Sequence, residues 1–375
     1  MVLPFLSLYL TTRVGVGIGT AGVLIAAYGV GAMIGGYAGG WAVDRYTALR
    51  VQVVSLLALG SGFLLLSELR DPLAIGVMLV CVSAVGEAFR PANGAMLAAV
   101  VPSGKRARAV ALNRLAINLG MAIGPSVGGL LASIDYLLLF WVDGLTCVAA
   151  AGFLVYVRGA LAPAPVEATV RSEISAGESP WSDRIFLACI GVFTLSTLVF
   201  MQLFSTLPVY FKEVWRLDEA AIGLLFAVNP VVIVLFEMVL VHRLSRPNPL
   251  RVVAVGALLV GIGLGVMPLY TGVLFAVCTV LVWSVGEMLE HPLVSAFFLG
   301  RGDEANRGRY MGVFQLAFAT AFVVSPILGA AVYEEFGPRV LWFGCAGMSV
   351  LAAVGYRAVG RALDRELASQ DRRIR

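Results

Sequence analysis

Between Val252 and Gly286 the chain reads VVAVGALLVGIGLGVMPLYTGVLFAVCTVLVWSVG, without one charged side chain. An α-helix needs about 20 mostly apolar residues to cross the hydrocarbon core of a bilayer. The stretch is too long for one such helix, and Tyr270-Thr271-Gly272 near its middle predicts a turn between two of them. These residues therefore predict a hairpin of membrane-spanning helices.

The composition of the whole chain also indicates a membrane protein. Of its 375 residues, 59% are hydrophobic and 13% are charged, whereas a soluble domain carries roughly 25% charged residues. Such a chain lacks about half of the usual solvated surface. We therefore exclude an ordinary cytosolic enzyme, a nucleic-acid-binding protein and a disordered protein.

Apolar stretches of the same kind recur along the chain. We predict an all-α integral membrane protein with eleven full spans, at residues 18–42, 51–68, 73–100, 107–132, 136–157, 185–211, 219–242, 250–269, 273–298, 308–333 and 340–358. Met1–Thr12 is also apolar but too short to cross a bilayer, so it counts as a partial first span.

Basic residues are concentrated on one side of the predicted membrane. If the loop 42–51 is cytoplasmic, that side receives 20 of the 27 Lys and Arg residues, and the other side receives five. Arg90 and Arg114 lie within spans. Because positively charged loops stay in the cytoplasm, we expect a plasma-membrane or inner-membrane protein with a cytoplasmic C-terminus.

An internal repeat relates the two parts of the chain on either side of residues 158–184. Matching residues lie 201 positions apart, or 200 in the last pair: Gly22 and Gly223, Arg50-Val51 and Arg251-Val252, Pro125-x-x-Gly128 and Pro326-x-x-Gly329, Glu87 and Glu287. Parallel six-helix repeats are typical of secondary transporters. We predict a bundle at 1–157, a cytoplasmic linker at 158–184, and a second bundle at 185–375 with a basic tail.

The repeat also concerns the partial first span. At the same offset Met1 corresponds to Gln202, which lies 17 residues inside the span that begins at Ile185. We therefore expect the first helix to begin upstream of Met1, so that this sequence lacks its cytoplasmic half. A protein with eleven and a half spans is the alternative.

Three motifs resemble those of the major facilitator superfamily. Gly40-Trp41-Ala42-Val43-Asp44-Arg45 has the G-x-x-x-D-R core of its loop motif, although Thr47 stands where glycine is usual. Arg90-Pro91-Ala92-Asn93-Gly94 resembles its R-x-x-q-G motif. Gly120-x-x-x-Gly124-Pro125-x-x-Gly128-Gly129 is similar to the motif of its drug/proton antiporter branch, with Ala111 in place of the first glycine of the longer form.

The resemblance implies a fold of two six-helix bundles and transport by alternating access. It further implies that Asp44 and Arg45 form a cytoplasmic latch that breaks during transport. The residues themselves indicate close helix packing in the fifth span, because glycines every four residues leave one helix face bare and a proline favours a kink. We assign this packing role to Gly120, Gly124, Pro125, Gly128 and Gly129.

Ionisable residues lie within several spans, where each costs on the order of 3 kcal/mol and usually faces a cavity or a partner. Glu87 and Glu287 lie at matching depth in pseudo-equivalent spans, near the midplane where such folds bind substrate. We predict Glu87, Glu287 and Glu290 as proton or cation sites, and Arg90 and Arg114 as gating counter-charges. A static network of buried ion pairs is the alternative.

Polar residues in other spans are candidates for lining a substrate cavity, because amide and aromatic groups suit an amphipathic substrate. The predicted residues are Tyr28, Asp143, Gln202, Tyr210, Asn229 and Glu237. Structural pairing is the alternative for Asp143 and for Glu237. His291 could titrate near neutral pH, or it could be a packing residue.

No cofactor, metal or ATP site is expected. The G-x-G-x-x-G pattern at 17–22 follows no strand, and the five cysteines lack metal-ligand spacing. This favours a secondary transporter over an enzyme, and we expect it to be a monomer. The resemblance to the drug/proton antiporter branch implies that it exports small amphipathic molecules or drugs in exchange for protons. The alternatives are an uptake symporter or a sugar or metabolite exporter, and more distantly a lipid flippase or an intramembrane enzyme.

Overall fold

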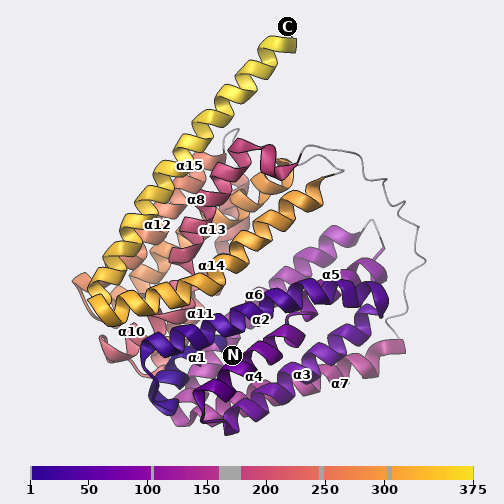
Figure 1. Cartoon of the computed structure of the whole chain (residues 1–375), viewed down its shortest axis with the longest axis vertical. Helices are drawn as coiled ribbons and strands as arrows, with labels where there is room; N and C mark the ends of the chain where they lie inside the picture. Colours follow the sequence, from indigo (N-terminus) through magenta and orange to yellow (C-terminus); the bar gives the residue numbers. More distant parts are fainter. Residues whose placement is uncertain (1, 103–104, 160–178, 245–248, 302–305, 375) are drawn as a thin grey trace. The chain divides into compact units, whose positions relative to one another are not determined.

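The computed structural model describes residues 2–102, 105–159, 179–244, 249–301 and 306–374 (Figure 1). These residues form helices and connecting turns, with no strand among them. In the described ranges, 11 helices are long and apolar enough to cross a membrane. They coincide with the eleven predicted full spans, which confirms the fold class.

The first six predicted spans correspond to the helices before residue 160. They are α1 (Leu3–Leu8) with the π-helical turn η1 (Tyr9–Val14), α2 (Ile18–Arg45), α3 (Ala48–Glu68), α4 (Pro72–Gly86), α5 (Phe89–Val100), α6 (Arg106–Ile134), and α7 (Tyr136–Tyr156) with the short η3 (Val157–Gly159). Side-chain caps define the starts of three of them, because Thr47 accepts a hydrogen bond from the Arg50 amide, Asp71 from the Ala74 amide and Asp135 from the Leu137 amide.

The fourth span is interrupted in its middle, where α4 ends at Gly86 and α5 begins at Phe89. Pro91 explains the break. It has no N–H to donate to the carbonyl of Glu87, four residues earlier, and its ring crowds that carbonyl. The Arg90 amide bonds the Glu87 carbonyl instead, at 3.2 Å. Glu87 therefore lies at a helix break within the span.

The remaining elements follow the predicted linker. They are η4 (Pro180–Ser182), α8 (Arg184–Phe200), α9 (Gln202–Ser205), α10 (Leu207–Glu213), α11 (Glu219–Leu244), α12 (Pro249–Gly265), η5 (Met267–Leu269), α13 (Val273–Arg301), α14 (Arg307–Phe336) and α15 (Pro338–Ile374). The predicted hairpin is confirmed: α12 and α13 are joined through η5 and Gly272, whose φ of 144° suits a residue without a Cβ. The helix α15 is longer than its predicted span, which ended at residue 358.

The chain divides into two compact units. The first contains the residues up to 170 together with 204–227 and 326–331, and the second contains the rest. Residues 160–178, most of the predicted linker 158–184, lie outside the described residues. The division into bundles at 1–157 and 185–375 therefore stays a prediction.

Aromatic side chains form the core of the second unit. Phe186 and Phe193 of α8 contact Phe298 of α13 edge-on, with ring centroids 5.4 Å and 5.9 Å apart. Tyr310 and Phe314 of α14 complete this cluster. Packing of this kind holds spanning helices together, because a lipid environment supplies little hydrophobic driving force between them. The cluster fixes α13, which carries most of the predicted coupling residues.

Candidate functional site

A polar cluster between α11 and α13 surrounds Glu287. The side-chain amide of Asn229 donates to Glu287 Oε2 at 2.8 Å and to Ser284 Oγ at 3.0 Å. Nδ1 of His291, one turn further along α13, lies 3.9 Å from Glu287 Oε1. Among the described residues, no lysine or arginine pairs with Glu287. Its carboxylate thus has neutral or titratable neighbours and no permanent counter-charge.

Glu290 lies on the same helix but has a different environment. The Tyr356 hydroxyl of α15 donates to Glu290 Oε1 at 3.1 Å, and Ser196 of α8 also hydrogen-bonds this carboxyl group. Glu290 is only 2% exposed, whereas the side chain of Glu287 is 17% exposed. Glu290 therefore connects α13 to α8 and α15, and this arrangement indicates a structural role.

His291 has a packing role as well as its proximity to Glu287. Its imidazole ring meets the ring of Phe200 edge-on, with centroids 4.5 Å apart. Pro292 follows it within α13. A ring held in this way has a defined orientation toward the carboxylate one turn before it.

In the first unit, Glu87 has a permanent counter-charge. Nε of Arg90 lies 2.6 Å from Glu87 Oε2, and the Tyr28 hydroxyl donates to Glu87 Oε1 at 3.3 Å. Tyr28 is buried on α2, while the Arg90 side chain is 79% exposed. The structure therefore brings together three of the predicted site residues, at the break between α4 and α5.

A row of amide side chains next to this pair was not predicted. Gln52 of α3 donates to Asn93 Oδ1 at 3.4 Å, and the Asn93 amide donates to Asn113 Oδ1 of α6 at 3.1 Å. Asn93 belongs to the R-x-x-q-G motif, and this motif was the one feature of the sequence that could have indicated a role for it. Its two partners come from helices whose proximity only the fold determines.

The other predicted charged residues have separate positions. Asp44 and Arg45 are exposed at the end of α2, where the guanidinium of Arg45 lies 6.0 Å from the ring centroid of Trp41. Arg114 is exposed on α6. Asp143 of α7 accepts a hydrogen bond from the Val2 amide at 3.1 Å, which connects α7 to the residue before α1.

Three predicted cavity residues are buried among packed helices. Gln202 donates to the Ser325 carbonyl at 2.9 Å and to Ser325 Oγ at 2.8 Å, which joins α9 to α14. Tyr210 is 2% exposed and lies against Trp215. Glu237 is 7% exposed within α11. Asn229 and Tyr28 each hydrogen-bond a predicted coupling carboxylate, Glu287 and Glu87 respectively.

Pro125 and Gly129 of the predicted packing motif lie at a close crossing of α6 and α11. A Cβ added to Gly223 of α11 would meet the Pro125 carbonyl and lie 3.0 Å from the Gly129 Cα. Gly124 and Gly128 are also buried. Among the described residues, no atom lies within 4 Å of a Cβ added to Gly120, so its packing role stays a prediction. The crossing lies along a different part of α6 from Gly120.

The repeat produces a second crossing like this one. A Cβ added to Gly22 of α2 would lie 2.5 Å from the Pro326 carbonyl and 2.6 Å from the Ala330 Cβ of α14. Gly22 and Pro326 correspond to Gly223 and Pro125 at the offset of 201. Two pseudo-equivalent glycines thus contact two pseudo-equivalent prolines, all within the first unit.

An unpredicted ion pair lies next to the α6–α11 crossing. Nζ of Lys212 lies 2.8 Å from Glu219 Oε1, and the buried Tyr136 hydroxyl donates to the same oxygen at 2.8 Å. Glu219 begins α11, and Tyr136 begins α7. In the sequence these three residues appear only as a tyrosine, a lysine and a glutamate near the ends of three spans. That pattern is too common to predict a contact.

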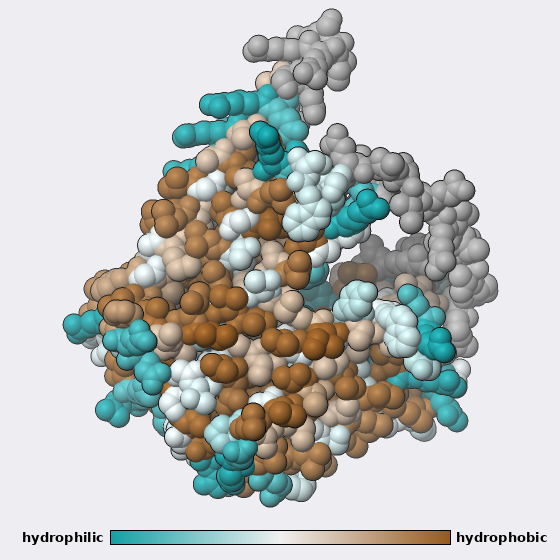
Figure 2. Space-filling view, in the orientation of Figure 1, coloured by the Kyte–Doolittle hydropathy of each residue, from teal (hydrophilic) through white to brown (hydrophobic). Residues whose placement is uncertain are grey.

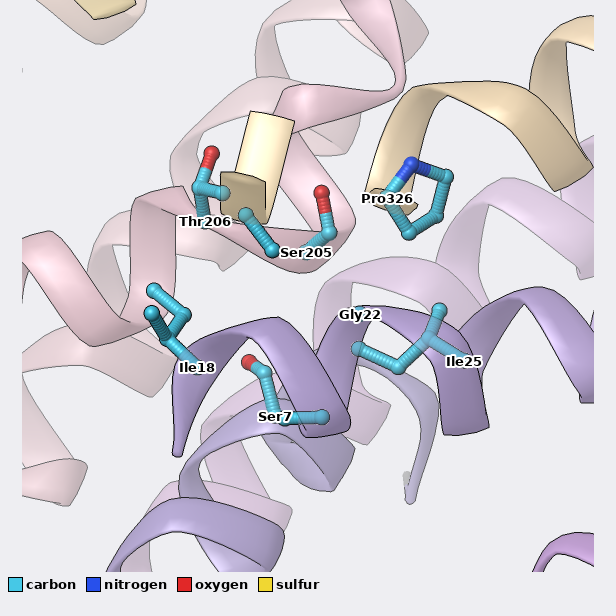
Figure 3. Close-up of a pocket in the computed structure, with 9 residues that line it drawn as sticks. Ser7, Ile18, Gly22, Ile25, Ser205, Thr206 and Pro326 are labelled. Atoms are coloured by element: carbon cyan, nitrogen blue, oxygen red, sulfur yellow. The ribbon is translucent and has the colours of Figure 1, made fainter. Parts of the chain in front are cut away.

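A small pocket lies at the α2–α14 crossing (Figure 3). Its empty volume is about 170 Å³, and it is too narrow to admit a water molecule. The labelled residues around it are Ser7, Ile18, Gly22, Ile25, Ser205, Thr206 and Pro326. The pocket is therefore a packing gap between helices and not the substrate site.

Comparison with known proteins agrees with this architecture. The family model described as Major Facilitator Superfamily matches residues 1–304. A curated relative from Planococcus maritimus, named as a Na(+), Li(+), K(+)/H(+) antiporter, is 24% identical over 92% of this chain and 86% of its own. Multidrug resistance protein MdtH from Yersinia enterocolitica is 22% identical, over 85% of this chain and 80% of its own.

A solved structure shows the likeness in fold. The crystal structure of a mutant of peptide transporter POT in complex with sulfate matches with a TM-score of 0.81 at 16% identity, covering 96% of this chain and 91% of that one. The spans, the repeat and the family match lead to one conclusion: the chain belongs to the Major Facilitator Superfamily, and it is a multi-pass membrane transporter rather than an enzyme.

Proposed function

We propose that this transporter is a proton-coupled antiporter in which Glu287 carries the exchanged proton. The observation that carries the proposal is a difference between two pseudo-equivalent carboxylates. Glu87 is paired with Arg90 at 2.6 Å, whereas Glu287 has Asn229, Ser284 and His291 as its polar neighbours.

This difference has a consequence for charge. An unpaired carboxylate within a span is costly, on the order of 3 kcal/mol, and a bound proton or cation removes that cost. Glu87 is neutralised by a residue of the chain itself, so it has less need of an external cation. Glu287 therefore suits the exchange of a proton, while Glu290 holds helices together and Glu87 with Arg90 and Arg114 supplies fixed charge.

We propose small amphipathic molecules as the exported substrate. The glycine-proline motif of α6 and the likeness to a multidrug resistance protein support this choice. A second candidate substrate is a monovalent cation, which the printed name of the Planococcus relative supports. Both candidates use the same proton site, and they differ in what leaves the cell in exchange.

The transport cycle follows from the repeat. In our proposal the bundles 1–157 and 185–375 rock about the site, and Asp44 and Arg45 belong to a latch on the cytoplasmic side. The protein works as a monomer in the plasma or inner membrane, with its C-terminus in the cytoplasm.

Transport by proteoliposomes with an acidic interior tests the proposal. A pH-sensitive dye inside the vesicles reports proton release after external addition of an amphipathic cation such as ethidium or, separately, of Na⁺, Li⁺ or K⁺ salts. We expect wild-type protein to release protons in response to one class of substrate. Glu287→Gln should lose this coupling, because an amide cannot carry the proton.

Glu290→Gln is the matched variant, with the same chemical change three residues away on the same helix. We expect it to retain coupled transport. Loss of coupling in Glu290→Gln together with full coupling in Glu287→Gln would show that the site is assigned to the wrong residue. A response to salts and none to amphipathic cations would replace the drug substrate by a monovalent cation.

A further inference from the structure

One face of α15 changes its chemistry abruptly along its length. Residues at spacings of three and four lie on the same face of a helix. Along this face Phe343, Gly347, Val350 and Val354 are all exposed. The exposed residues that continue the same series are Arg357, Arg361 and Arg365.

The opposite face of the same helix packs inward throughout. Trp342, Ala352 and Tyr356 are completely buried, and Val359 and Leu363 are 6% and 8% exposed. Figure 1 shows α15 alongside α8 and α12, with its last turns beyond the ends of those helices. The apolar and basic residues of the outer face therefore belong to one continuous outward-facing stripe.

The length of the stripe matches the thickness of a lipid bilayer. Arg339 and Arg357 are 18 residues apart, about 27 Å along a helix, and the hydrocarbon core is about 30 Å thick. The change from Val354 to Arg357 occurs within one turn, as expected where a helix leaves the hydrocarbon core. Arg357 and Arg365 then span about 12 Å beyond that boundary, which covers the headgroup layer.

The acidic residues of this segment do not neutralise the arginines. Asp364 pairs with Arg251 of α12 at 3.0 Å, and Glu366 pairs with Arg301 of α13 at 3.0 Å. In the described part of the chain, none of the three arginines of the stripe forms an ion pair. Figure 2 shows the resulting contrast, with hydrophilic residues at this end of the molecule next to an apolar surface.

An exposed tryptophan at the same end of the second unit indicates that this end lies at the membrane–water interface. Trp181 is 65% exposed and lies two residues before Asp183, which pairs with Arg301 at 2.6 Å. Arg301 also binds Glu366 of α15. Exposed tryptophans are enriched at the level of lipid headgroups. The position of Trp181 thus agrees with the boundary derived from the stripe.

We propose that Arg357, Arg361 and Arg365 form a binding site for anionic phospholipid headgroups, with the acyl chains lying along the apolar part of the same stripe. A guanidinium binds a phosphate through two parallel hydrogen bonds, and a turn of helix separates each arginine from the next. The site lies on the lipid-facing surface and is separate from the proposed transport site. It is present whichever way the protein is oriented.

Native mass spectrometry of the full chain in detergent tests this site. In detergent both ends of the helices are accessible to added lipid, so the result does not depend on how the protein is oriented in a membrane. The probes are phosphatidylglycerol, phosphatidylcholine and inorganic phosphate. We expect wild-type protein to retain phosphatidylglycerol and to unfold at a higher temperature in its presence. Arg357→Gln, Arg361→Gln and Arg365→Gln combined should weaken this binding on the order of 100-fold.

A control variant removes the same charge from scattered positions. Arg108→Gln, Arg158→Gln and Arg309→Gln combined lose three exposed arginines from three separate segments, and this variant should bind phosphatidylglycerol like wild type. Equal binding by wild type and the stripe variant would overturn the proposal, as would equal stabilisation by phosphatidylcholine or by inorganic phosphate. Loss of binding in both variants would show dependence on net charge and would also overturn it.

Discussion

Three carboxylates within spans, Glu87, Glu287 and Glu290, differ in the partner that each one has. An arginine neutralises the first, an amide hydrogen-bonds the second, and a tyrosine hydroxyl bonds the third. Their residue type is the same, so in our proposal the partner decides the role. The arginine makes a static pair with Glu87, the buried hydroxyl makes a structural contact with Glu290, and we propose that the amide leaves Glu287 available to a proton.

At the residue scale, the contact between Tyr356 and Glu290 should contribute to stability. Tyr356→Phe keeps the ring but leaves the 2% exposed Glu290 without this donor. An unsatisfied buried polar group costs about 1–3 kcal/mol, so the variant should unfold at a lower temperature in detergent, followed by tryptophan fluorescence. Adding Glu290→Gln should produce less than the sum of the two separate losses. An unchanged unfolding temperature for Tyr356→Phe would contradict the structural role.

At the scale of elements, the crossing of α6 and α11 depends on the absence of side chains. Gly223→Ala places a methyl group against the Pro125 carbonyl and the Gly129 Cα. Overpacking of this kind costs about 1–3 kcal/mol, so we expect a lower unfolding temperature and slower transport.

Gly120→Ala is the matched change on α6, where nothing lies within 4 Å of the added atom. There the substitution should be neutral or stabilising by about 0.5–1 kcal/mol, because alanine favours a helix more than glycine does. Equal effects of the two substitutions would show that the crossing is not tightly packed in the membrane.

Another prediction at this scale concerns the ends of α8, α13 and α15. Burial raises the pKa of the Asp183 carboxyl. Hydrogen bonds from Arg301, the Phe186 amide and Tyr310 lower the pKa by more than burial raises it, so this pKa lies below its ordinary value. A lowered pKa stabilises the folded state above the unfolded-state value of about 3.9. That contribution disappears as pH falls through the folded-state pKa.

Asp183→Asn keeps a capping residue at the start of α8 but loses the charge that pairs with Arg301. Between pH 5 and 8 we expect the variant to unfold at a lower temperature than wild type, by the equivalent of about 2 kcal/mol. The difference should shrink as pH falls below about 3.9 and vanish only below the lowered folded-state pKa of Asp183. A difference that persists at low pH would assign the effect to something other than the carboxylate charge.

At the scale of the whole molecule, the distribution of basic residues predicts the orientation of all spans together. Thr271→Cys lies in the turn between η5 and α13, and Ser182→Cys lies in η4 at the other end of the helices. In a background without the exposed Cys81 and Cys278, a membrane-impermeant maleimide should label Thr271→Cys in intact cells. It should label Ser182→Cys only after permeabilisation. The reverse pattern would place the C-terminus outside.

Much of this molecule could be derived from its sequence, because a bilayer imposes simple requirements. Each span needs about 20 apolar residues and must satisfy its own backbone hydrogen bonds, so the eleven full spans and the α12–α13 turn could be predicted. The contact between Glu87 and Arg90 could be predicted too, because the two residues are three apart. Pro91 could have predicted the break after α4. We instead predicted one continuous span there.

The tertiary structure alone decided which residues from distant parts of the chain meet. Asn229 and Tyr356 lie 58 and 66 residues from the carboxylates that they bond, and no local spacing connects them. Gly129 packs against α11 while Gly120 does not, because two helices touch only where their axes cross. The sequence by itself determined the spans, the repeat and the charged residues within the spans; the packing of the helices decided which partner each of those charges has, because residues far apart in the chain meet only where helices touch.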